Sequence, residues 1–279
     1  MLRTAVSPVC ADPHPASHWV VEVEGLEDPG AVSALGRYAT ALIAQVVRID
    51  LLFSAELLEV SPAFLTTLTA NVHQAIGGDN HISNDFRRYQ RDPWITEAIG
   101  HLLFRIAAEQ DSHCVPGRVA VLTLPHIQVR QQGLDLIGVY TLGDGDGDGD
   151  GDGAGISITE SKASETYANS QLTKAVKLFR ALDRGDRSSD LLQALNVFTN
   201  YLPDNLRAAA PAAMWAGERI YAPLLAFRTS FHPTTERPTT LGALKVPHDC
   251  RRLLAVRLND YGTFFDEAAD AMRTAIGDY

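Results

Sequence analysis

An alternating glycine–aspartate tract, GDGDGDGDGDG at residues 143–153, separates two apolar segments that are rich in β-branched residues. Glycine and aspartate are depleted in strands, and a charged tract of this kind has no apolar surface to bury. The flanking segments, GLDLIGVY (133–140) and GISITESK (155–162), read as strands. We therefore expect a β-hairpin with arms at 133–142 and 154–162 and with the tract as its loop.

The register of this hairpin follows from the position of the tract. Pairing that is symmetric about the centre of the tract places Asp135 opposite Glu160 and Ile137 opposite Ile158. Residues that pair across a hairpin share a face of the sheet. That face is therefore apolar along its length and carries two carboxylates at its open end. Because side chains alternate along a strand, Lys162 is expected beside Glu160 on the same face.

Helices and strands around the hairpin predict an α/β (α+β) fold. Asp92-Pro93 opens an amphipathic helix, RVAVLTL (118–124) is typical of a buried strand, and a second amphipathic helix covers 165–183. A helix followed by three strands and another helix indicates a mixed central sheet flanked by helices. Outside this core the pattern predicts strands at 18–26, 221–231 and 251–258, helices at 28–47, 62–76, 188–200 and 263–276, and a polar loop at 77–92.

The two carboxylates and the lysine indicate a particular chemistry. Two partly buried carboxylates repel each other, and a divalent cation between them removes that cost. Mg²⁺ favours oxygen ligands and typically takes one or two carboxylates together with water and phosphate. Such a metal lowers the pKa of bound water and neutralises charge on a phosphodiester. The Lys162 ammonium can orient the attacking water or stabilise the charged transition state.

These residues resemble the core of the PD-(D/E)XK nuclease superfamily, in which an aspartate on one strand is followed by Glu-x-Lys on the next and then by a helix. The resemblance covers residues 92–183 and implies a restriction-endonuclease-like core. It implies that Asp135 and Glu160 hold Mg²⁺ or Mn²⁺ and that Lys162 is the catalytic lysine. Leu134 stands where the motif name has proline, which lowers the specificity of the match.

The same resemblance implies two further site residues. Many members add a metal-binding glutamate from the preceding helix, for which Glu97 is the best match and Glu109 a weaker one. Some members place a catalytic glutamine on the following helix, where Gln171 is suitably placed. The alternatives stay open, because Glu97 also fits a solvated residue near a helix N-terminus and Gln171 also fits a structural role.

A narrower similarity suggests a biological setting. GLDLIGVY followed by ITESKAS, behind a helical N-terminal region, is similar to the HamA nuclease subunit of Hachiman antiphage defence. This similarity implies a DNA nuclease that acts beside a superfamily 2 helicase, HamB. The net charge of −10 fits an enzyme that depends on a partner to reach a polyanion. We therefore divide the chain into a possible partner-binding region at 1–91 and a nuclease-like domain at 92–279.

Other functions remain compatible with the sequence. A stand-alone restriction or repair endonuclease carries the same residues, and so does an inactive nuclease-like subunit that serves only as an interaction module. In the inactive case Asp135 and Glu160 are polar strand ends, and Lys162 forms an ordinary surface salt bridge. Five cations at 174–187 form either a phosphate-binding face or a solvated helix face: Lys174, Lys177, Arg180, Arg184 and Arg187. No register of the glycine–aspartate tract matches an EF-hand loop, so we interpret the tract as solvated.

The cysteines and the hydropathy bear on location. Three scattered cysteines form no CxxC pair, which argues against a zinc cluster or a disulfide framework. No apolar run reaches the ~18 residues of a membrane span. We therefore expect a cytoplasmic protein.

Overall fold

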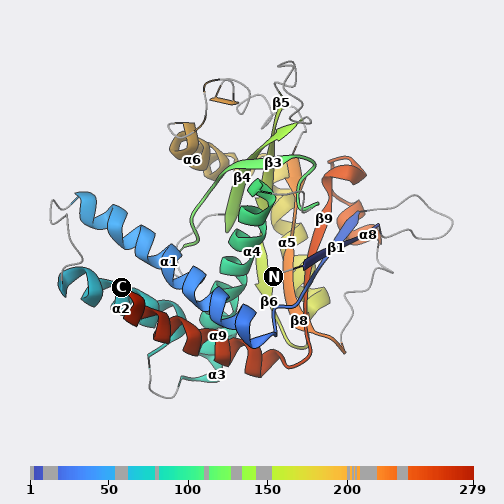
Figure 1. Ribbon diagram of the computed structural model, residues 1–279. Helices are drawn as coiled ribbons and strands as arrows, with labels where there is room; N and C mark the ends of the chain where they lie inside the picture. The colour runs from blue at the N-terminus through green and yellow to red at the C-terminus, as the bar shows by residue number, and fades with distance from the viewer. Residues whose placement is uncertain are drawn as a thin grey trace.

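The computed structural model describes residues 3–8, 18–53, 62–78, 82–109, 113–126, 134–142, 153–199, 202, 204, 206–207, 219–230 and 238–279. The glycine–aspartate tract falls almost entirely outside these residues, so its interpretation as a solvated loop stays a prediction. Figure 1 shows the arrangement of the elements along the chain.

The secondary structure follows the predicted order of strands and helices. The elements are β1 (Arg3–Pro8), β2 (Trp19–Glu24), α1 (Pro29–Phe53), α2 (Pro62–Ile76), α3 (Asn84–Phe86), the π-helix η1 (Arg87–Arg91), α4 (Asp92–Glu109), β3 (Arg118–Leu122), β4 (Leu136–Leu142), β5 (Gly153–Thr159), β6 (Ser161–Ala163), α5 (Ala168–Asp183), α6 (Ser188–Thr199), β7 (Arg219–Tyr221), β8 (Leu224–Arg228), α8 (Pro238–Gly242), the 3₁₀ turn η2 (His248–Cys250), β9 (Arg252–Leu258), α9 (Tyr261–Ala275) and the 3₁₀ turn η3 (Ile276–Asp278).

The strands form two sheets, and two segments of the chain pass from one sheet into the other. One sheet has the order β1-β2-β9-β8-β6, and the other has the order β3-β4-β5-β7. Only Glu160 separates β5 from β6, and only residues 222–223 separate β7 from β8. The parallel pairs β5–β7 and β6–β8 keep the same register. The Leu224 N–H also donates to the Glu160 carbonyl across the break (3.0 Å). The chain therefore passes from one sheet to the other at Glu160.

The predicted hairpin is confirmed. β4 and β5 pair antiparallel, with Ile137 opposite Ile158 and Val139 opposite Ile156. The same register, extended by one residue, sets Asp135 opposite Glu160 just beyond the last ladder pair. The prediction of one continuous strand at 155–162 is wrong, because the segment forms two strands, β5 and β6, that are separated by Glu160.

Alternate strand residues enter two hydrophobic cores on opposite faces. Leu254 and Val256 of β9 join the core that contains α4, whereas Leu253 and Ala255 join the core that contains α5. This alternation is the period of two expected for a sheet that is buried on both faces. The fold is therefore a mixed α/β structure with helices on both sides of the strands, and the finer assignment to a nuclease core is taken up below.

The N-terminal helices pack against the C-terminal one. α1 and α9 lie side by side although they come from opposite ends of the chain (Figure 1). Their close approach depends on Gly36, where an added Cβ would lie 2.4 Å from the Ala271 Cβ and 2.7 Å from the Ala271 carbonyl carbon. In addition, β2 pairs in parallel with β9. The division of the chain at residue 91 stays a prediction, and these contacts are among those that join its two parts.

One segment within the described residues, Pro29–Val47 of α1, is long and apolar enough to span a membrane by composition alone. This finding differs from the expectation that no segment reaches that length. Half of the segment is buried, and Leu35, Ile43 and Val47 lie in the core beside α9. We interpret α1 as a core helix, and the cytoplasmic location stays a prediction.

The predicted loop at 77–92 is wrong over its second half, because α3 and η1 occupy residues 84–91 and run directly into α4. The segment is polar in sequence, but tertiary ion pairs hold it in helical form. Arg87 and Arg91 both bind Asp266 of α9. Charged residues without an apolar stripe give no helical periodicity in sequence, which explains the error.

We expect Gly36→Val to destabilise the fold by about 1–3 kcal/mol, because the new side chain would overlap the backbone of α9 and force the helices apart. Chemical denaturation followed by circular dichroism would measure the change. Gly30→Ala, at a position where an added Cβ meets nothing within 4 Å, is the control. An unchanged unfolding free energy for Gly36→Val would contradict the tight crossing.

Candidate metal-binding and catalytic site

Asp135 and Glu160 meet at the point where the chain leaves the hairpin. The Asp135 side chain accepts a hydrogen bond from the Ser161 N–H at 2.7 Å. That N–H follows directly after Glu160, so the break between β5 and β6 supplies the donor that fixes Asp135. The open end of the hairpin therefore carries two neighbouring carboxylates, as its register predicts.

Lys162 lies against the same carboxylates. Its ammonium group donates to Glu160 Oε1 and, at 3.1 Å, to the Ser161 carbonyl. The Glu160 side chain is 10% exposed and that of Lys162 is 25% exposed, so this ion pair is largely shielded from water. It differs in this respect from the exposed salt bridge of the structural alternative.

Helix α4 brings in a third carboxylate. Glu97 is buried, and its Oε1 accepts a hydrogen bond from the His126 backbone N–H at 3.0 Å. Trp94, one turn earlier, donates from its indole nitrogen to the His126 carbonyl at 2.9 Å. Two side chains of α4 therefore clamp the backbone of the segment that follows β3. The alternative that Glu97 is a solvated helix residue is wrong.

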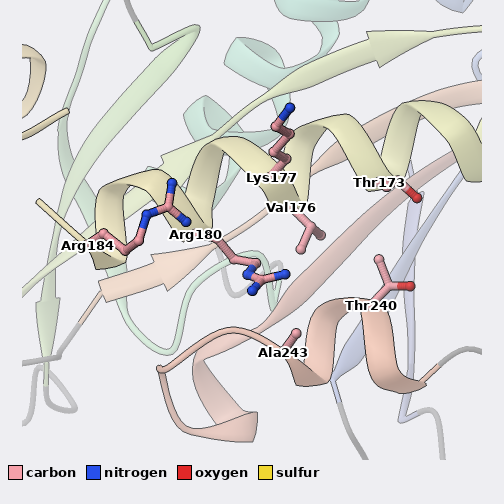
Figure 2. A pocket seen from close by; sticks show the side chains of 7 residues that line it. All are labelled: Thr173, Val176, Lys177, Arg180, Arg184, Thr240 and Ala243. Atoms are coloured by element: carbon pink, nitrogen blue, oxygen red, sulfur yellow. The ribbon is translucent and has the colours of Figure 1, made fainter. Parts of the chain in front are cut away.

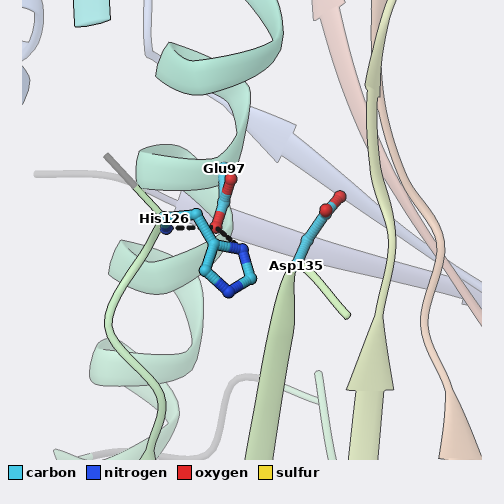
Figure 3. Close-up of side chains that lie close together, drawn as sticks. All are labelled: Glu97, His126 and Asp135. Atoms are coloured by element: carbon cyan, nitrogen blue, oxygen red, sulfur yellow. Dashed lines mark hydrogen bonds and ion pairs between the residues drawn. The ribbon is translucent and has the colours of Figure 1, made fainter. Parts of the chain in front are cut away.

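Glu97, His126 and Asp135 each offer a ligand atom, and these atoms lie within 4.8 Å of one another. Figure 3 shows the three side chains gathered between α4 and β4, with the Glu97 carboxylate facing both the His126 backbone and its ring. The His126 Nδ1 lies 3.9 Å from Glu97 Oε1. Two oxygen donors and one imidazole nitrogen form a set that binds divalent metals.

The sequence gives no signal for His126. It belongs to no HExxH or HxH pattern, and it lies 29 residues after Glu97 and 9 before Asp135. Its place is set by the two hydrogen bonds from α4 to its backbone, which are tertiary contacts. A search for histidines near the predicted carboxylates therefore requires the fold.

The three carboxylates resist ionisation. Burial raises the pKa of Glu97 well above its ordinary value, and the neighbouring Asp135 carboxylate raises it further. Burial likewise raises the pKa of Asp135, against the opposing effect of the Lys162 ammonium. The pKa of Glu160 rises to about 7, first through burial and then through repulsion by Asp135. The cluster therefore holds more negative charge than its surroundings stabilise.

The two basic groups respond differently. Burial by itself would lower the pKa of Lys162, but the Glu160 and Asp135 carboxylates more than offset it, and the pKa is raised. Lys162 is therefore a cation at neutral pH and not a base. Burial lowers the pKa of His126, against the opposing effect of Glu160, so its ring stays neutral and available as a metal ligand.

Unsatisfied polar atoms mark the break in the strand. Three consecutive residues each have a buried side-chain oxygen without a hydrogen-bond partner: Thr159 Oγ1, Glu160 Oε2 and Ser161 Oγ. Buried polar atoms are normally hydrogen-bonded, and exceptions call for an ion or a water molecule. Lys162 occupies Glu160 Oε1, which leaves Oε2 as the Glu160 oxygen that could face a metal. Among the described residues, the group whose ligand atoms lie within 4.8 Å of one another is Glu97, His126 and Asp135, and Glu160 is not part of it. The predicted ligands Glu97 and Asp135 therefore fit a divalent cation, and a metal-binding role for Glu160 stays a prediction.

The remaining predicted residues lie less clearly at the site. Gln171 is partly exposed on the first turn of α5, where its backbone N–H donates to the Tyr167 carbonyl, and its catalytic role stays a prediction. Glu109 pairs with Arg105 at 3.1 Å on the exposed end of α4. The structure thus gives it a surface partner.

The five cations of the predicted phosphate-binding face do not act as one group. Lys177, Arg180 and Arg184 line a pocket of about 510 Å³ between α5 and α8. Figure 2 shows Arg180 reaching toward α8, whereas the Lys177 ammonium points away from it. Arg187 instead pairs with Asp190, and its charge lowers the pKa of Glu160. Arg187 is thus the member of the face that acts on the carboxylate cluster.

Comparisons of this chain with protein-family models, with curated proteins and with solved structures find no match.

Proposed function

We propose that this chain is a metal-dependent deoxyribonuclease of the PD-(D/E)XK type, which hydrolyses phosphodiester bonds with Mg²⁺ or Mn²⁺. The observation that carries the proposal is the convergence of Asp135, Glu160 and Lys162 at the open end of the hairpin with Glu97 of α4 beside them. The resemblance implies these four residues in these roles. Their placement supports the restriction-endonuclease-like core as the finer assignment of the fold.

Each residue has a role in this proposal. Asp135 and Glu97 would hold the metal, with Glu160 Oε2 and the His126 ring completing the donor set. When bound, the metal would supply an activated water and would neutralise charge on the phosphate. Lys162, held as a cation by its acidic neighbours, stabilises the negative charge that develops on the phosphoryl oxygens. Burial of the cluster strengthens each of these electrostatic effects.

The inactive interaction module is the less favoured alternative. It would be supported by separated carboxylates or by a lysine directed away from them. Lys162 instead binds Glu160, and Asp135 perturbs the pKa of both Glu160 and Glu97. An ordinary structural salt bridge does not require three buried carboxylates of raised pKa.

We further propose that the nuclease acts as the effector of an antiphage defence complex with a superfamily 2 helicase, as the similarity to HamA implies. The acidic net charge of −10 supports a dependence on a partner for delivery to DNA. The stand-alone endonuclease is the competing proposal. It requires the isolated chain to bind and cut DNA efficiently.

Degradation of plasmid DNA by the purified chain tests both proposals. We expect cutting with Mg²⁺ or Mn²⁺ and none with EDTA, and we expect a partner helicase with ATP to increase the rate. Equal rates with and without the helicase would favour the stand-alone enzyme. No cutting under any of these conditions would contradict the nuclease and favour the interaction module.

A further inference from the structure

An exposed group of aromatic and cationic side chains lies where η1 meets the start of α5. The Arg88 guanidinium lies 5.2 Å from the centre of the Tyr89 ring and 5.9 Å from the centre of the Tyr167 ring. Tyr89 is 61% exposed and Tyr167 is 59% exposed, although tyrosine rings usually bury most of their area. We refer to Arg88, Tyr89 and Tyr167 as the Arg88 cluster.

Among the residues that the structure describes, Arg88 forms no ion pair with a carboxylate. Its neighbours Arg87 and Arg91 both bind Asp266, so their charges serve the packing of η1 on α9. Within the part of the chain that the structure describes, Arg88 has only its two tyrosine partners. The cluster therefore presents a positive charge and two aromatic rings to solvent.

The backbone beneath the cluster is itself unusual. Arg88 and Tyr89 lie in a five-residue π-helix. π-helical segments are rare, and they occur frequently at functional sites. The segment follows α3 and precedes α4 without a break.

The cluster is continuous with the elements that hold the proposed catalytic residues. Glu97 follows Tyr89 by eight residues, which is roughly 12 Å along a helix axis. Tyr167 follows Lys162 by five residues, at most roughly 18 Å of extended chain. A nucleic-acid strand that reaches the carboxylates is therefore within a few nucleotides of the cluster.

We propose that the Arg88 cluster is a stacking platform for unpaired nucleobases, so that the substrate at this site is single-stranded DNA or a frayed strand of a duplex. The identification of DNA as the ligand rests on the proposed nuclease function. Aromatic rings and guanidinium planes stack on the faces of bases, and the positive charge attracts the adjoining phosphates. Bases within a duplex already stack on one another, so only an unpaired base offers its face.

Fluorescence anisotropy with a labelled single-stranded oligothymidylate tests the platform, with EDTA present so that binding does not depend on cleavage. We expect Tyr89→Leu and Tyr167→Leu each to weaken binding about 10-fold, because each removes one stacking surface. Tyr89→Phe and Tyr167→Phe keep the ring and should bind as the native chain does. Binding of the corresponding duplex should change little. Leu192→Ala, at an exposed apolar residue on α6, is the matched control.

The outcomes separate this proposal from the nuclease. If the chain cuts DNA but the leucine variants bind single strands normally, the platform is wrong and the nuclease stands. Equal weakening of single-strand and duplex binding would also overturn the platform. If the leucine variants lose single-strand binding but the native chain never cuts, the nuclease is wrong and the platform stands. Loss of helicase binding with unchanged affinity for the oligothymidylate would overturn the platform and identify a protein interface.

Discussion

Replacement of Lys162 by alanine is expected to lower the rate of Mg²⁺-dependent DNA cleavage by about 10²–10³-fold, the usual effect of removing one group that stabilises developing charge. Lys162 is the cation that binds Glu160, and its side chain is 25% exposed at the edge of the carboxylate cluster. Without it, the charge on the phosphoryl oxygens loses its protein partner. The Glu160 carboxyl also loses the larger of the two cationic influences that lower its pKa, Arg187 being the other, so metal binding weakens as well.

Single-turnover cleavage of plasmid DNA measures this rate, and circular dichroism verifies that the variant is folded. Lys245→Ala is the matched control, because Lys245 is an exposed lysine that lies outside the cluster. Its variant should cut at the native rate. Native activity in the Lys162→Ala variant would contradict the assignment of a catalytic lysine and, with it, the PD-(D/E)XK reading of the hairpin.

The ionisation of Glu160 is expected to cost the metal-free protein about 3 kcal/mol of stability at neutral pH. The pKa of Glu160 is about 7 in the folded chain against an ordinary 4.5, so the folded state binds more protons than the unfolded state between these values. The contribution of this group therefore falls as the pH rises through that window. A shift of this size corresponds to about 3 kcal/mol.

The buried histidines act in the opposite direction in the same range of pH. The pKa values of His18 and His101 are lowered to about 4, chiefly by burial, so their contribution rises with pH. The stability of Glu160→Gln must therefore be compared with that of the native chain at each pH, in EDTA. As the pH rises from below 4.5 to above 7, we expect the unfolding free energy of the variant to increase by about 3 kcal/mol relative to that of the native chain.

The effect of Mg²⁺ on the melting temperature tests whether the same carboxylates bind a metal. A cation bound at the cluster favours the ionised carboxylates, so it should raise the melting temperature of the native chain above pH 7 and that of Glu160→Gln less. Glu267→Gln, at an exposed glutamate on α9, is the control and should follow the native chain throughout. Stability that is independent of both pH and Mg²⁺ would show that the carboxylates are not a metal site.

The local pattern of the sequence determined most of the fold. The glycine–aspartate tract marked the loop of the hairpin, and its symmetry set the β4–β5 register that the structure contains. Proline at the first helical position marked the starts of α1 and α2, whereas Asp92-Pro93 lies inside a helical run that already includes α3 and η1. The same register gave the proximity of Asp135 and Glu160, because residues opposite each other on paired strands share a face.

Only the tertiary structure decided the rest of the site. His126 joins the carboxylates because Trp94 and Glu97, one turn apart on α4, bind its backbone. No periodicity in sequence records a contact between a helix and a loop some 30 residues later. The perturbed pKa values likewise follow chiefly from burial. The ion pairs that Arg87 and Arg91 of η1 make are to Asp266, far along the chain. Pairing within a hairpin is local and is encoded by alternation, whereas burial and contacts between distant elements exist only once the chain has folded.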